Sequence, residues 1–144
     1  KNNLNQYRMY LSNDVNFERA FHHEFFHILE YYMADGVKYL YYAWNSYNPS
    51  GFEYEEDVTK LTDEFVYSKY ATEEENKHTY FLTKYSKVSP REDRAEMFAD
   101  LMMINKKEGY LKNGTNIDNK INYLINEIYE NISIGYFHFS DYLD

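Results

Sequence analysis

The sequence predicts a single domain over residues 1–144 that is mainly helical, with a small β component (α+β). Two long segments repeat apolar residues at intervals of three and four, which is the spacing of one face of an α-helix. A serine-proline pair opens a third segment as a helix start. The hydrophobic fraction of 44% is enough for one core in a chain of 144 residues.

The first expected helix covers residues 14–34. Polar residues at its start supply candidate N-caps, and an Asp-Gly pair at 35–36 supplies the stop. A short strand is expected just before this helix, over residues 6–11. Apolar or aromatic side chains recur along the helix at Phe21, Phe25, Ile28, Leu29 and Tyr32. We therefore expect it to be half-buried.

The middle of the chain has weaker patterns. Residues 37–46 are rich in tyrosine and predict a helical or mixed segment, in which Trp44 is expected to pack in the core. An acidic section contains an expected helix around residues 57–70, followed by a charged, solvated loop over 72–77. Residues 81–86 have too short an apolar pattern to separate a strand from a turn.

The clearest helix start lies at Ser89-Pro90-Arg91-Glu92. The serine suits the N-cap, the proline suits the first helical position, and the glutamate three residues after the cap completes a capping box. This helix is expected to continue to about residue 107. A last amphipathic helix follows, with one apolar side formed by Ile117, Ile121, Leu124, Ile125 and Ile128.

Composition limits the possible partners. There are 15 Lys and Arg against 24 Asp and Glu, so the net charge is −9. This charge argues against binding to nucleic-acid phosphates or anionic membranes, and it favours a positively charged peptide or a metal ion. No apolar stretch approaches the ~18 residues of a membrane span, so no membrane insertion is expected. The absence of cysteine excludes disulfides and thiolate zinc sites.

One motif indicates chemistry: residues 23–27 form the pattern His-Glu-x-x-His inside the first expected helix. Histidines four apart lie on one helix face, so His23 and His27 can both reach one Zn²⁺, with Glu24 beside a metal-bound water. This pattern is typical of zinc-dependent hydrolases. It arises by chance in roughly one chain in fifty of this composition, so a surface turn or a pair of core histidines is the alternative.

A catalytic zinc usually takes three protein ligands, so two histidines require a partner. Without cysteine, that partner is a histidine or a carboxylate. The other histidines are poor candidates: His22 points about 100° away from His23 on the same helix, His78 lies in a charged segment, and His138 lies in an aromatic tail.

The helix that begins at Pro90 is the better source of the third ligand. It presents Glu92, Glu96 and Asp100 on one face, and a line of carboxylates on a partly apolar helix is costly without a cation. Glu92 has a competing role in the capping box, and Glu96 and Asp100 can form an ordinary solvated stripe. From the residues alone, Glu92 and Glu96 are equally good candidates.

The motif at residues 23–27 and the run from Tyr85 to Phe98, Tyr-Ser-Lys-Val-Ser-Pro-Arg-Glu-Asp-Arg-Ala-Glu-Met-Phe, together resemble the active-site motifs of a known group. These are gluzincin metallopeptidases of the anthrax lethal factor and Pro-Pro endopeptidase type. In that group a tyrosine stands seven residues before a glutamate ligand, and the ligand opens a Glu-x-x-Ala-Glu sequence. Both features are present here.

The resemblance implies that His23, His27 and Glu92 bind Zn²⁺ and that Tyr85 faces the reacting carbonyl. It also implies that Glu96 is a carboxylate behind the ligands. The fold it implies is a zincin-like domain in which the motif helix packs beside the helix with the glutamate ligand, together with a small sheet. The implied setting is a bacterial protein that is secreted or held at the cell surface.

The expected function is hydrolysis of a peptide or protein substrate by an endopeptidase, with Glu24 as general base for a zinc-bound water. Zn²⁺ and Tyr85 would stabilise the oxyanion, and Glu96 or Glu30 would accept an N–H bond from a ligand histidine. One alternative is a catalytically inactive zinc-binding interaction module, in which His138 or Asp100 closes the site. Another is a tyrosine-rich helical interaction domain without metal.

The chain departs from the group in several places. Phe26 stands where relatives of lethal factor have glycine, Glu30 stands where they have aspartate, and the stretch between His27 and Glu92 is longer. Substrate preference, including cleavage beside proline, therefore does not carry over. Zincin proteases place a sheet with a substrate-binding edge strand before the motif helix, so we expect this chain to be a fragment or to lack a flexible upstream part.

Overall fold

The computed structural model describes residues 16–33, 40–103, 114–132 and 139. Its elements are α1 (Phe17–Met33), α2 (Leu40–Ser46), the 3-10 turn η1 (Val58–Lys60), α3 (Glu73–Asn76), the 3-10 turn η2 (Tyr85–Lys87), α4 (Pro90–Met103) and α5 (Asn116–Asn131). Within the described residues there is no β-strand, and a single parallel bridge joins Val66 to Phe81. The prediction of a mainly helical protein is confirmed.

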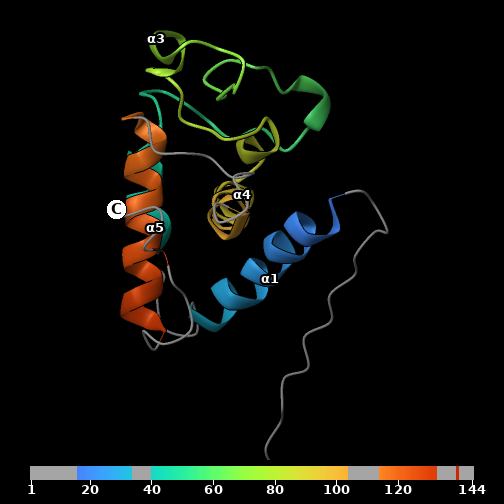
Figure 1. Ribbon diagram of the computed structural model, residues 1–144, viewed down its shortest axis with the longest axis vertical. Coiled ribbons are helices and arrows are strands. Elements are labelled where there is room, and N and C mark those ends of the chain that lie inside the picture. Colours follow the sequence, from blue (N-terminus) through green and yellow to red (C-terminus); the bar gives the residue numbers. More distant parts are fainter. Residues whose placement is uncertain (1–15, 34–39, 104–113, 133–138, 140–144) are drawn as a thin grey trace, which may run out of the picture.

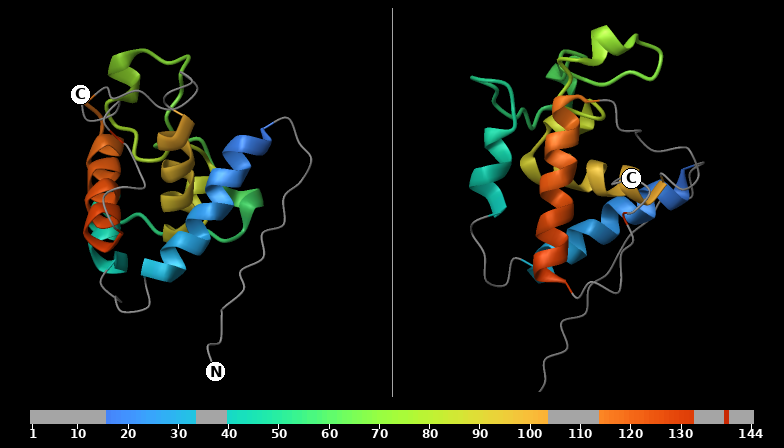
Figure 2. Two further views of the ribbon diagram at one scale, coloured as in Figure 1. Left: turned by 60° about the horizontal axis from the view of Figure 1, so that its bottom comes forward. Right: turned by 60° about the vertical axis from the view of Figure 1, so that its left-hand side comes forward.

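Helix α4 occupies the centre of the arrangement. Figure 1 shows it nearly end-on between α1 and α5, and the left view of Figure 2 shows the same order from another side. It packs along α1 on one side and contacts α5 and α2 on the other. Every residue from Asp93 to Ala99 is consequently buried, although this run contains three charged side chains.

The apolar core joins these helices. Phe26 of α1 lies against Phe98 of α4, with ring centroids 5.0 Å apart, and Trp44 of α2 is fully buried, as expected. The five residues predicted for the apolar side of the last helix, Ile117, Ile121, Leu124, Ile125 and Ile128, are all buried. That part of the prediction is confirmed because the periodic apolar pattern depends only on local sequence.

The buried side of α1 differs from the expected one. Phe21 and Tyr32 are 40% and 68% exposed, and the buried side chains are His23, Phe26, Leu29, Glu30 and Met33. The helix turns its charged and histidine side chains inward because charged groups on α4 face it. Three of these five buried side chains are apolar, and the expected Leu29 is one of them; polar contacts with α4 add His23 and Glu30 to the buried side.

The expected helix over residues 57–70 is wrong. Only η1 is helical there, and Phe65 adopts a left-handed backbone with φ 62°. Its carbonyl accepts the N–H groups of Tyr80 and Phe81, and the Tyr67 N–H donates to the carbonyl of Phe81. The segment forms backbone hydrogen bonds with residues 80 and 81 in place of those of a helix.

The remaining segments expected from the sequence can be compared with the structure only in part. The charged segment 72–77 contains the short helix α3, because Thr72 and Glu75 form a capping box. Residues 81–86 hold the bridge at Phe81 and the start of η2. The expected strand over residues 6–11, the end of the helix expected to reach residue 107 and His138 lie outside the described residues. In the described part of the chain, no helix has the length and apolar character needed to cross a membrane.

A buried ion pair ties α4 to α5. The Nζ of Lys120 lies 2.7 Å from Oδ2 of Asp93, and both side chains are fully buried. Trp44 Nε1 and the hydroxyl of Tyr54 donate to the same oxygen, at 2.9 Å and 3.0 Å. Lys120 Nζ also lies 4.0 Å from the centroid of the Phe81 ring. Asp93 therefore joins α4 to α2, to α5 and to the loop between α2 and η1 that carries Tyr54.

Replacement of Lys120 tests this pair. Lys120→Met should lower the free energy of unfolding by about 3–5 kcal/mol, because Asp93 would remain buried without a cation. The control is Lys77→Met, which removes an exposed pair with Glu74 and should cost at most about 1 kcal/mol. Urea unfolding measures both. Equal losses in the two variants would contradict the role assigned to the buried pair.

Candidate metal centre

His23 and His27 lie one turn apart on α1 and face α4. Their ring centroids are 4.9 Å apart, with the rings nearly perpendicular. Their side chains are 10% and 12% exposed, so both rings are largely shielded from solvent but remain reachable from one side. The four-residue spacing places both rings on one helix face, as expected from the sequence.

The carboxylate of Glu92 reaches both rings from the first turn of α4. Its Oε2 lies 2.9 Å from Nε2 of His23 and 3.4 Å from Nε2 of His27. The Ser89 hydroxyl accepts the backbone N–H of Glu92 at 3.2 Å, so the serine caps the helix while the glutamate side chain points to the histidines. The serine therefore caps α4, as the capping box predicted, while the glutamate side chain contacts the histidines and not the cap.

The spacing of these three donors suits a small cation. One ligand atom from each of His23, His27 and Glu92 lies within 4.8 Å of the others. Tetrahedral zinc with ligands at about 2.0–2.1 Å places its ligand atoms about 3.3 Å from one another. Among the described residues, this is the one group of three or more histidine and carboxylate side chains that is close enough to hold a metal ion.

Glu96 lies behind this group, one turn further along α4. Its Oε1 is 2.8 Å from Nδ1 of His23, the ring nitrogen that faces away from Glu92. Arg19 donates to both oxygens of this carboxylate, at 3.2 Å and 2.8 Å, and the Thr83 hydroxyl donates to Oε2 at 2.9 Å. The structure therefore brings Glu92, and not Glu96, to the two Nε2 atoms.

Glu30, the alternative to Glu96 as acceptor of a histidine N–H, pairs with arginines of α4. Arg94 Nε donates to its Oε1 at 2.5 Å, and Arg91 Nε lies 3.5 Å from its Oε2. Arg91 Nε also donates to Nδ1 of His27 at 3.1 Å. Of the two carboxylates proposed to accept an N–H bond from a histidine, Glu96 is in that position and Glu30 is paired with arginines.

The charges of the group favour a cation between the carboxylates. Burial opposes protonation of His23, but its hydrogen bonds to Glu92 and Glu96 outweigh burial and raise its pKa to about 9. Burial likewise opposes ionisation of the two glutamates, yet hydrogen bonds from the histidines lower the pKa of Glu92 to about 2, and bonds from His23 and Arg19 do the same for Glu96. Without metal, a protonated His23 lies between two carboxylates.

Tyr85 and Glu24 flank an open hollow of about 280 Å³ beside this group. Tyr85, in η2, has its ring centroid 6.0 Å from that of His23 and is 45% exposed. Partial burial raises the pKa of its phenol, and the nearby carboxylates of Glu92, Glu24 and Glu96 raise it further. The phenol therefore keeps its proton at neutral pH and can donate a hydrogen bond into the hollow.

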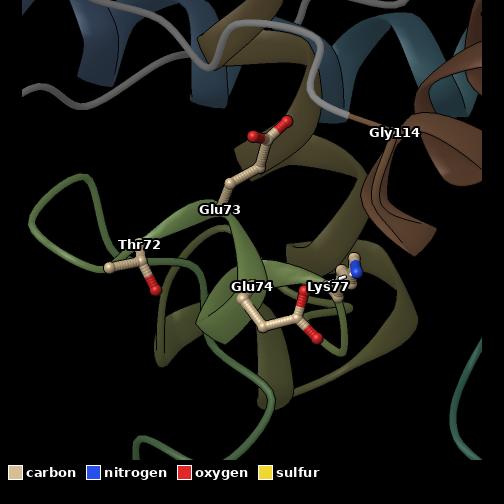
Figure 3. A pocket seen from close by; sticks show the side chains of 5 residues that line it. All are labelled: Thr72, Glu73, Glu74, Lys77 and Gly114. Carbon is tan, nitrogen blue, oxygen red and sulfur yellow. Dashed lines mark hydrogen bonds and ion pairs between the residues drawn. The ribbon is translucent and has the colours of Figure 1, made fainter.

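A second hollow, of about 520 Å³, is lined by Thr72, Glu73, Glu74, Lys77 and Gly114 (Figure 3). Lys77 forms an ion pair with Glu74 within it. None of the residues of the metal group lines it. Of the residues expected from the sequence, His23, Glu24, Tyr85 and Glu96 line the first hollow, whereas His27 and Glu92 do not.

Three residues that contact the group or Glu96 behind it were not singled out from the sequence: Arg91, which contacts His27, and Arg19 and Thr83, which contact Glu96. Arg19 stands four residues before His23, so helix spacing alone places it on the histidine face. Thr83 and Arg91 give no comparable signal. In comparisons with known proteins, no protein family, curated protein or solved structure matches the chain. Its function is therefore inferred from this site.

The pKa shifts predict how stability depends on pH in metal-free protein. The pKa of His23 is raised from 6.5 to about 9, so the stability that its charge contributes is fully present below pH 6.5 and is lost as pH rises through 9. The pKa values of Glu92 and Glu96 are lowered from 4.5 to about 2. The stability that their charges contribute is therefore present above pH 4.5 and is lost as pH falls through 2.

Thermal unfolding in the presence of a chelator should therefore show a stability difference between wild type and His23→Gln that is largest below pH 6.5 and shrinks progressively up to pH 9. The matched control is His78→Gln, because His78 is exposed and its substitution should leave the pH profile unchanged. A difference between wild type and His23→Gln that stays constant from pH 6 to pH 9 would refute the charge arrangement described here.

Proposed function

We propose that this chain is a zinc-dependent peptidase of the zincin type, in which His23, His27 and Glu92 hold Zn²⁺. The observation that carries the proposal is the position of the Glu92 carboxylate, within 2.9 Å and 3.4 Å of the two histidine Nε2 atoms. The resemblance of the sequence to gluzincin metallopeptidases had assigned the same three residues. The contacts support that assignment, since they bring side chains from two helices together.

The donor set suits a catalytic zinc better than a structural one. Two imidazole nitrogens and one carboxylate oxygen form the His₂Glu set of zinc hydrolases, which leaves a fourth position open. Asp100, a candidate for closing the site, lies 3.7 Å from Arg19 and is not part of the donor group. Among the described residues, nothing else completes a four-ligand site.

Zn²⁺ bound in such a site supplies an activated water and polarises the carbonyl of the scissile bond. Glu24 lies at the hollow beside His23 and would take the proton from the water and return it to the leaving amine. The protonated phenol of Tyr85 would donate to the developing oxyanion, an interaction worth about 3–4 kcal/mol for a well-placed donor. The substrate is accordingly a peptide or protein.

A second candidate is a zinc-binding interaction module without catalytic activity. The observation in its favour is the aromatic surface of α1, where Phe17, Phe21 and Tyr32 are 50%, 40% and 68% exposed. Exposed aromatic residues along one helix are a feature of many binding surfaces. A base beside the donor group, Glu24, is unnecessary in such a module, and this favours the peptidase.

Zinc content after dialysis distinguishes the ligand from the carboxylate behind it. Wild type should retain about one equivalent of zinc, Glu92→Ala should lose it, and Glu96→Ala should retain most of it at saturating metal, with weaker affinity. Metal analysis of the purified proteins measures this. The opposite order of the two variants would refute the assignment of Glu92, and absence of zinc in wild type would refute the metal site.

Cleavage of a broad peptide library tests catalysis. Glu24→Gln should bind zinc as wild type does but cleave about 10²–10⁴-fold more slowly, because the general base is lost while the donor group is intact. Mass spectrometry of the products, with Glu24→Ala in parallel, measures the rates. Equal cleavage by wild type and the variants would indicate a contaminating peptidase, whereas a zinc-loaded wild type without activity would favour the interaction module.

A further inference from the structure

We propose that Arg19 is a positioning residue of the metal centre that acts on His23 through Glu96. This inference rests on the proposed function, because it concerns how the zinc ligands are held. Arg19 lies four residues before His23 on α1 and donates to both oxygens of Glu96. It does not belong to the donor group itself.

The hydrogen bonds of Glu96 explain why the arginine matters. An ionised carboxylate offers about four acceptor positions, and here all four are used. Oε1 faces Nη1 of Arg19 at 3.2 Å and Nδ1 of His23 at 2.8 Å. Oε2 accepts from Nη2 of Arg19 at 2.8 Å and from the Thr83 hydroxyl at 2.9 Å. Rotation of the carboxylate would break several of these bonds at once.

The orientation of Glu96 in turn fixes the ring of His23. A proton on Nδ1 bonded to Glu96 leaves Nε2 as the nitrogen that faces Glu92. Hydrogen bonds of this kind select the tautomer and ring orientation of ligand histidines. Without Arg19, Glu96 would carry a buried charge with fewer partners and would be free to turn toward the metal position.

The geometry requires an arginine in particular. The guanidinium fork spans both carboxylate oxygens, whereas a lysine ammonium can supply the charge at only one point. Asp100 lies 3.7 Å from Nη2 of Arg19 and holds the guanidinium from the next turn of α4. The side chain of Arg19 is only 27% exposed, so its pairing with Glu96 is partly shielded from solvent.

The test is the affinity for Zn²⁺ alone, measured by competition with a chelating dye. Arg19→Met should weaken zinc binding about 10- to 100-fold, and Arg19→Lys should lose less because the charge remains. The matched control is Lys84→Met, which removes a cation paired with Asp63 on the surface and should leave the affinity unchanged. Arg19→Lys keeps the proposal testable if Arg19→Met does not fold.

A double-mutant cycle separates positioning from general destabilisation. In a Glu96→Gln background, Arg19→Met should have little further effect on zinc affinity, because its action passes through the carboxylate. A loss of equal size in both backgrounds, or an unchanged affinity in Arg19→Met, would overturn the role of Arg19 while leaving the proposed function intact. Failure of wild type to bind Zn²⁺ would overturn both.

Discussion

The structure depends on one constraint: α4 carries charged side chains into the middle of the protein, and each must meet an opposite charge there. An unpaired buried charge costs several kcal/mol. The partners come from other helices: Asp93 with Lys120, Arg94 with Glu30, and Glu96 with Arg19 and His23. These pairs fix α4 between α1 and α5 and set its rotation about its own axis. The position of Glu92 follows from that rotation.

The same constraint links the fold to the proposed chemistry. Glu92 and Glu96 enclose His23, so the group stabilises positive charge, either a proton on the imidazole or a metal cation. Thr83 accepts the N–H of Ser86 while donating to Glu96, and this connects the turn that carries Tyr85 to the same carboxylate. Through Glu96, His23 and the turn that carries Tyr85 belong to one hydrogen-bonded network.

Local patterns in the sequence predict part of this structure and miss the rest for physical reasons. The apolar face of α5 and the Ser89 cap of α4 are predicted, because both depend on residues close in sequence. The irregular segment around Phe65 is not, because its hydrogen bonds go to residues 80 and 81. The His-Glu-x-x-His motif identifies His23 and His27, but Arg19 and Thr83 gain their roles only through the position of Glu96 after folding.

The central claim is that two imidazoles and one carboxylate of this chain hold Zn²⁺ and leave one position open. X-ray absorption fine structure at the zinc edge of the loaded protein tests it most directly. The account predicts four nitrogen or oxygen neighbours at about 2.0–2.1 Å, with the outer-shell scattering of two imidazole rings. A shell of six oxygens, or scattering from fewer or more than two imidazoles, would contradict it.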